Sequence, residues 1–359
     1  MTRVPLPEVQ NRIPDRQSEE RLAQLRREAS QRGTVGGTGV VPVGAPFPKA
    51  SGETGYYGIP MLKEPQWTKE VPVYFFVGGA AGAAAVVASA ANMLTRDRTL
   101  VRDARWVAAV GGFLSPALLI SDLGVPSRFL NMLRVFKLQS PMNVGAWTLV
   151  AFSSFSAAAA FANLARERVA DVMPVRMVEG VSGLLSSATG MLLSTYTGVL
   201  IGATAIPVWN SHVATLPHHF AASGVNSAVS ILELLGHDDS RALNLLGIAA
   251  SGFEVYEGIE VETRHDIVSE PLHKGLSGLI VRTGGILSGP VPLALRVGSL
   301  ITGNRNLRRA ASWSGLVGSL LTRFGWIQAG HASAKDHRIP LKLSRNAGEI
   351  RKSSHELAA

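Results

Sequence analysis

Long apolar runs separated by short polar stretches fill the chain from residue 71 to residue 332. Each run has about 20 residues or more, the length that an α-helix needs to cross roughly 30 Å of hydrocarbon. The pattern predicts an all-α membrane protein: a bundle of eight transmembrane helices, arranged as two four-helix halves, with no sheet. The predicted spans are 71–94, 104–123, 142–164, 178–206, 210–235, 241–261, 275–301 and 311–332.

The polar ends of the chain divide it into three parts. Residues 1–60 are rich in Arg, Glu, Gly and Pro and are predicted to be disordered or wrapped around a partner. Residues 61–333 form the predicted membrane domain, and residues 334–359 form a basic polar tail. No apolar run opens the chain, so we expect the first span to direct insertion rather than a cleaved signal. Eight spans place both termini on one side, called face A; face B is the opposite side.

Composition agrees with a lipid environment, because 46% of the residues are hydrophobic and only 17% are charged. The net charge of +9 comes mainly from the tails and the loops, as expected of a membrane protein rather than a nucleic-acid-binding one. Lys and Arg divide evenly between the two faces and do not orient the chain. The absence of cysteine excludes thiolate-held iron–sulfur clusters and disulfides. Small-residue runs such as Gly78–Gly82 predict close helix packing.

Polar residues gather where the predicted spans meet face A. Ionisable groups at membrane depth are costly, so they normally line a cavity, pair with one another or carry protons. The candidates for a pocket at this boundary are Lys69, Tyr74, Asp122, Arg128, Tyr196, His218, His219, Glu254 and Glu257.

Each candidate also has a structural interpretation. Asp122 and Arg128 could cap a helix and anchor it at the headgroups. Tyr196 precedes Trp209 by 13 residues, about 20 Å of helix, which is too deep for the interfacial aromatic belt if Trp209 marks the interface. The adjacent His218 and His219 must point to different sides of a helix, so one of them is structural.

Two glutamates suggest a proton route. Glu254 and Glu257 are three residues apart and share one helix face, where they suit proton transfer. Because the acidity continues into the following loop, a solvated helix end explains the same residues.

Several segments, taken in order, resemble the NrfD-type membrane subunits, of which the polysulfide reductase membrane subunit is the familiar member. The resemblance runs from about Gly55 to Asp336. It rests on Tyr56-Tyr57-Gly58-Ile59-Pro60 with Trp67, Tyr74-Phe75-Phe76-Val77-Gly78-Gly79, Asp122-Leu123-Gly124 with Pro126 to Phe129, Ser140-Pro141-Met142 with Gly145-Ala146-Trp147, Thr195-Tyr196-Thr197-Gly198 with Pro207-Val208-Trp209, and Arg323-Phe324-Gly325-Trp326 with Ala329-Gly330.

The resemblance implies a quinone-binding subunit of a respiratory oxidoreductase in a bacterial inner membrane, not catalytic alone. It implies ubiquinone or menaquinone as exchangeable substrate, no haem or iron–sulfur cluster on this chain, a ferredoxin-like iron–sulfur partner and a molybdopterin catalytic subunit. Tyr196 stands where the family has a tyrosine that hydrogen-bonds the quinone carbonyl. The family's asparagine and histidine at the start of the first span are replaced here by Lys69 and Val73, so Lys69 or Tyr74 is the candidate substitute donor.

Three other functions compete with this interpretation. A haem-bearing subunit would need histidine pairs that face each other across spans, whereas only the adjacent His218 and His219 lie within a span. A secondary transporter would use broken helices, and residues 207–217 are the single candidate interruption. A membrane anchor without quinone chemistry predicts the same partners.

Overall fold

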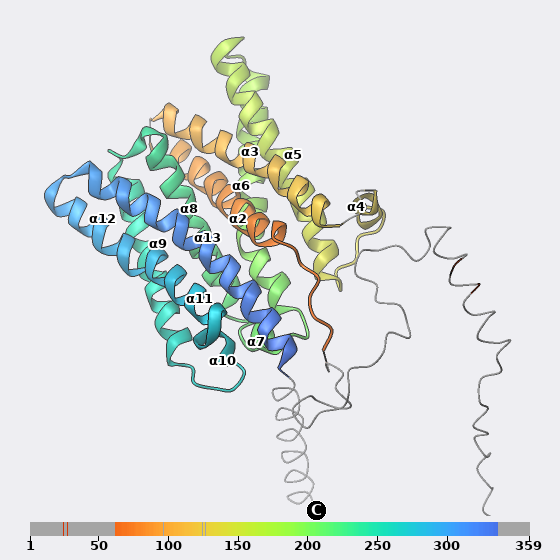
Figure 1. Ribbon diagram of the computed structural model, residues 1–359. Helices are drawn as coiled ribbons and strands as arrows, with labels where there is room; N and C mark the ends of the chain where they lie inside the picture. The colour runs from red at the N-terminus through yellow and green to blue at the C-terminus, as the bar shows by residue number, and fades with distance from the viewer. Residues whose placement is uncertain are drawn as a thin grey trace, which may run out of the picture. The chain divides into compact units, whose positions relative to one another are not determined.

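The structure is a computed structural model that describes residues 62–336 apart from Arg96, Gly124 and Pro126, together with Gln24 and Arg27. The helices named below all belong to one compact unit, Ala50–Ala359. In the described part every regular element is helical (Figure 1). The predicted tails lie outside the described residues, except for those two N-terminal positions and the end of the last helix. The elements are α2 (Glu70–Leu94), α3 (Arg98–Asp122), α4 (Arg128–Met132), α5 (Pro141–Arg168), α6 (Met173–Gly202), α7 (Pro207–Ser211), α8 (Leu216–Leu232), η2 (Glu233–His237), α9 (Arg241–Thr263), α10 (Glu270–His273), α11 (Gly275–Ser288), α12 (Pro290–Thr302) and α13 (Arg305–Lys335).

The all-α membrane bundle is confirmed. Five helical segments are long and apolar enough to cross a membrane, namely α2, α3, α5, α6 and Gly275–Thr302, which joins α11 and α12. Helices α8, α9 and α13 occupy the other three predicted spans but do not meet both criteria of length and apolar composition. Helix α8 has 17 residues before η2 begins, and the inward-facing polar residues of the second half are described below. The count of eight spans therefore stays a prediction.

Helix boundaries differ from the predicted spans where capping and proline decide them. Helix α3 begins six residues earlier than the predicted 104, because the Asp97 carboxylate accepts hydrogen bonds from the N–H groups of Thr99 and Leu100 at 3.0 Å. The predicted fourth span ends early at Gly202, and the short helix α7 follows. The predicted seventh span is interrupted at Gly289, since Pro290 starts a new helix.

The helices pack as two four-helix halves that share α2 as a central element. In the first half, α2 and α5 each contact both α3 and α6, and in the second half, α8 contacts α9 and α13, which also contact α11 and α12. Helix α2 also contacts α8 and α13, which joins the halves. A Cβ on Gly82 would lie 2.4 Å from the Gly190 carbonyl oxygen of α6. A Cβ on Gly224 of α8 would lie 2.8 Å from the Gly79 oxygen. Glycine therefore allows the backbones of α6 and α8 to touch that of α2, as the small-residue runs predict.

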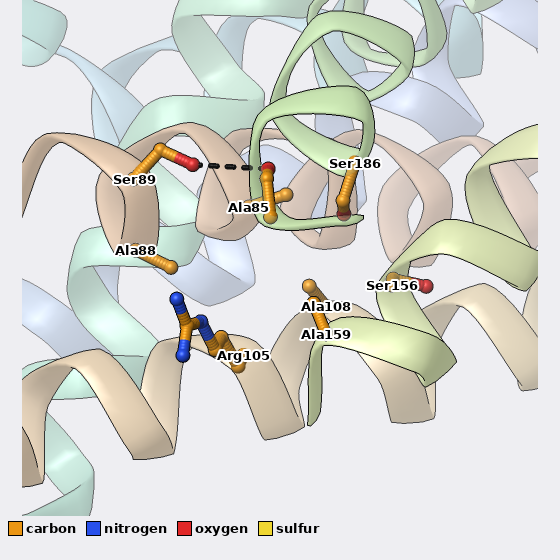
Figure 2. A pocket seen from close by; sticks show the side chains of 9 residues that line it. Ala85, Ala88, Ser89, Arg105, Ala108, Ser156, Ala159 and Ser186 are labelled. Atoms are coloured by element: carbon orange, nitrogen blue, oxygen red, sulfur yellow. Dashed lines mark hydrogen bonds between the residues drawn. The ribbon is translucent and has the colours of Figure 1, made fainter. Parts of the chain in front are cut away.

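A buried ionic cluster stands at the face-B end of the first half. Figure 2 shows Arg105 of α3 pointing from below toward a small gap among alanines and serines of α2, α5 and α6. The gap measures only about 10 Å³, close to the lower limit for one water molecule. Arg105 pairs with the buried Glu179 of α6, which also accepts from Arg166 at 2.5 Å and from Asn163 at 3.2 Å. The cluster neutralises charges that lipid would not solvate.

Candidate functional site

A small, partly open cavity lies at the face-A end of the first half. Its walls come from α2, α3, α5 and α6, together with Trp67 just before α2 and Met132 at the end of α4. The cavity measures about 60 Å³, roughly twice the share of liquid volume that one water occupies. Three predicted site residues, Tyr74, Asp122 and Tyr196, line it together. The topological argument from the sequence requires this meeting, because the start of α2 and the ends of α3 and α6 share a face.

Tyr196 is the polar group that stands out in this cavity. Its side chain is 8% exposed, and its hydroxyl lies beside the backbone of Gly145 but donates no hydrogen bond to an acceptor in the described part of the chain. The ring lies against the backbone of Gly145 at the start of α5, where a Cβ would come within 2.1 Å of Tyr196 Cε1. Gly145 therefore makes the space that the ring occupies. A buried hydroxyl left without a partner costs about 1 to 3 kcal/mol, so it calls for a ligand or a function.

Asp122 closes the same cavity from the end of α3 and has a structural contact. Its Oδ1 accepts a hydrogen bond from the backbone N–H of Thr68 at 3.1 Å and a second one from the Thr68 hydroxyl. These bonds tie the chain just before α2 to the end of α3. The carboxylate is half-buried, so Oδ2 is the oxygen left for other contacts.

An aromatic wall separates this cavity from the second half. Trp67 stacks on Trp209 of α7 with ring centroids 5.0 Å apart and an interplanar angle of 15°. The Trp209 ring donates from Nε1 to the Trp326 carbonyl oxygen of α13 at 2.7 Å. Next to it, Glu64 contacts His331 and Lys335 of α13 at 3.0 Å. The segment that enters α2 is therefore held by the end of α13.

The other predicted site residues do not line the Tyr196 cavity. Lys69 is exposed immediately before α2 and is not part of the cavity wall. Arg128 begins α4, but its side chain lies outside the described residues. His218 is exposed and bonds back to the Ala214 carbonyl of its own chain segment at 3.0 Å, whereas His219 is buried. The expectation that these two histidines point to different sides is confirmed.

Glu254 and Glu257 belong to α9 in the second half. Both are buried, at 3% and 4% exposure, and neither reaches the Tyr196 cavity. Glu257 lies near Glu260 and His218, whereas Glu254 contacts α8. The single pocket predicted from the sequence is therefore two separate polar regions, because the second half has its own polar interior.

Sequence reasoning missed the cavity residues that carry no charge. Met132 and Met142 form part of the wall, and both are flexible side chains that can yield to a ligand. Thr68 was missed because its partner lies 54 residues away. Gly145 stands in a motif quoted above, yet its role beside Tyr196 depends on a contact between two helices.

The comparison with known families rests on the same part of the chain. The family model described as polysulfide reductase matches residues 53–335, which includes every helix that builds the cavity. The chain belongs to the polysulfide reductase family. As a family member of the NrfD type it is a multi-pass integral membrane protein and a membrane subunit of an oxidoreductase, and it works with other oxidoreductase subunits. No curated protein matches the chain.

Proposed function

We propose that this polysulfide reductase family member exchanges electrons between an iron–sulfur partner subunit and the membrane quinone pool, with the quinone head group bound in the Tyr196 cavity. The observation that supports this is the buried Tyr196 hydroxyl, which donates no hydrogen bond to an acceptor among the described residues and lines a space shared with Tyr74 and Asp122. A quinone carbonyl oxygen is an acceptor that such a hydroxyl would satisfy.

Quinone reduction requires only a hydrogen-bond donor and a proton route from this chain. Reduction of a quinone takes two electrons and two protons and converts both carbonyls to hydroxyls. Tyr196 would donate a hydrogen bond to one carbonyl oxygen and stabilise the charge that develops there. Asp122 would pass a proton through Oδ2, while Oδ1 stays on Thr68. The chain has no cysteine to hold a cluster, so the electrons would come from a ferredoxin-like partner, with a molybdopterin subunit beyond it.

The size of the cavity sets a condition on entry. About 60 Å³ does not hold a substituted ring without movement of the walls. Met132 is half-buried and Met142 is exposed on its outer side, so these two side chains would move to admit the head group. The quinone, whether ubiquinone or menaquinone, would therefore bind by displacing methionine side chains.

Two conservative substitutions test the proposal in the assembled complex in a bacterial inner membrane. Tyr196→Phe keeps the ring against Gly145 and removes one donor, so it should weaken quinone affinity by about 0.5 to 1.5 kcal/mol, roughly two- to twelve-fold. Asp122→Asn should slow turnover more than it changes affinity, because it removes the proton carrier.

The matched control is Tyr256→Phe, since Tyr256 is 61% exposed on α9. It should leave the KM for a soluble quinone analogue and kcat unchanged. Unchanged quinone kinetics in both Tyr196→Phe and Asp122→Asn, with the complex intact, would place the quinone elsewhere.

A further inference from the structure

Helix α8 and its extension η2 carry a buried polar stripe on one face. His219, Ser223, Asn226, Ser230 and Glu233 recur at intervals of three or four residues, and all are buried. That spacing places them on one helix face. The 14 steps from His219 to Glu233 cover about 21 Å at 1.5 Å per residue, some two-thirds of a hydrocarbon core of about 30 Å. Such a continuous polar interior is not needed by the quinone site in the other half.

Helices α12 and α13 present matching polar groups to this stripe. Arg323 of α13 donates to the Ser223 hydroxyl at 2.5 Å and to the Phe220 carbonyl at 2.9 Å. Arg296 of α12 donates to the Ser230 hydroxyl at 3.2 Å. Both arginines are fully buried. The second half thus encloses a polar column, defined here as the α8 stripe and the side chains of α9, α12 and α13 that contact it.

The column contains two buried glutamates in different states of pairing. Glu233 accepts from Arg296 Nη1 at 2.7 and 2.8 Å and from the Ser312 hydroxyl at 2.6 Å, so its charge is fixed by an ion pair. Glu254 accepts a long bond from Asn226 at 3.4 Å and interacts with the side chains of Ser288 and Ser223, but among the described residues it has no ion-pair partner within 4 Å. Arg323 acts on it only at longer range. An unpaired buried carboxyl is stable at rest as the neutral acid, which has a proton to give.

Both ends of the column reach charged groups near the membrane faces. At face A, His219 and His212 pack against Trp326, with ring centroids 6.2 and 5.3 Å away. Both ring nitrogens of His219 lack partners in the described structure, and His212 interacts with Asp266 in the loop after α9. At face B, Asp238 follows the stripe and pairs at 2.7 Å with Arg309, whose side chain is 57% exposed. Groups that exchange protons therefore stand at each end and in the middle.

We propose that this polar column is a proton-transfer path across the second half, with Glu254 as the exchanging group. The neutral Glu254 would release its proton past Asn226 and Ser230 toward Asp238, and the carboxylate left behind would take up a proton arriving from the His219 end. The reverse direction uses the same groups. The buried Glu233–Arg296 ion pair lies beside this route and has no net charge. If the column were only structural, we would expect Glu254 to have an ion-pair partner, as Glu233 does. A carboxyl group without such a partner stabilises helix association no better than an amide.

The test uses the full chain alone in liposomes, without quinone or partners, so that its outcome is separate from that of the proposed quinone site. A potassium diffusion potential is imposed with valinomycin, and proton entry is followed with an internal pH-sensitive dye. Vesicles with the wild-type chain should acidify several-fold faster than protein-free vesicles. Glu254→Gln should return the rate to that of empty vesicles, whereas Glu254→Asp should retain part of the flux.

The matched control is Glu262→Gln on the same helix, where Glu262 is half exposed and pairs with Arg282; this variant should conduct like the wild type. A second measurement does not depend on the folding of a variant: dicyclohexylcarbodiimide, which reacts with protonated carboxyls in apolar surroundings, should label Glu254 and block the flux. A wild-type rate equal to that of empty vesicles, undiminished flux in a folded Glu254→Gln chain, or blockage without label on Glu254 would each overturn the proposal.

Discussion

The Glu233–Arg296 pair makes a quantitative prediction about stability. Both side chains are fully buried, and the carboxylate has two bonds from Arg296 Nη1 and one from Ser312. Arg296→Met keeps the length of the side chain and removes the cation, so Glu233 is left as a buried charge with one hydroxyl donor. Breaking a buried pair in this way costs about 3 to 5 kcal/mol, mostly through the charge left unpaired.

The second substitution shows whether pairing is the cause. In the double variant Arg296→Met with Glu233→Gln no charge is left behind, so the loss of stability should fall below that of Arg296→Met alone. The resulting coupling free energy should be about 2 kcal/mol or more. The matched control is Arg282→Met, which breaks a pair whose side chains are 48% and 51% exposed. This substitution should cost less than about 1 kcal/mol.

Unfolding by sodium dodecyl sulfate in mixed micelles, followed by the fluorescence of the six tryptophans, measures these differences. Costs that simply add in the double variant would refute the reasoning, because they would mean that Glu233 does not depend on Arg296 for its burial. An Arg282→Met loss as large as that of Arg296→Met would refute it equally, since burial would then not be the deciding factor.

Two further changes test other parts of the structure. Gly145→Ala should displace the Tyr196 ring, since its Cβ would lie 2.1 Å from Cε1, and should raise the KM for quinone without loss of the assembled complex; Gly180→Ala, with open space around its Cβ, is the control. The hydrogen bonds from the Thr99 side chain and the Leu100 N–H hold the pKa of Asp97 below its ordinary value. A lowered pKa in the folded state means that this cap stabilises the protein above about pH 4 and that the contribution is lost as the pH falls through the folded pKa. Asp97→Ala should therefore cost about 1 kcal/mol at neutral pH and much less near pH 3, and an equal cost at both pH values would contradict the assignment.

The sequence was sufficient for the architecture of the first half and for its cavity. Apolar length places α2, α3, α5 and α6, and connectivity alone brings Tyr196 and Asp122 to one face. These inferences succeed because they depend on local hydrophobicity and on a chain that crosses and returns. The depth argument for Tyr196 was wrong in its premise, because α6 ends at Gly202 and Trp209 belongs to the separate helix α7, so the 13 residues between them do not measure depth along one helix.

Ion pairs between residues far apart in the sequence could not be predicted in this way. Arg105 and Glu179 are separated by 74 residues, and Glu233 and Arg296 by 63, so nothing local links them. One signal was available, however: the polar positions from His219 to Glu233 repeat at helical spacing inside an apolar run. A periodic polar face within a span indicates a polar interior, and it would have separated Glu254 from the Tyr196 cavity.

The turn at η2 has a consequence for insertions and deletions in the chain. The helical path is broken at Gly236, which takes a φ of 113°, a left-handed conformation that favours glycine. Removal of one residue just before it, such as the exposed Leu235, would move Gly236 out of the kink. His237 Nε2 would then leave its place 2.9 Å from Asp103 Oδ2 on α3, and Asp238 would leave Arg309. The kink at Gly236 therefore lets the α8 stripe face the polar column while the residues after it reach the neighbouring half.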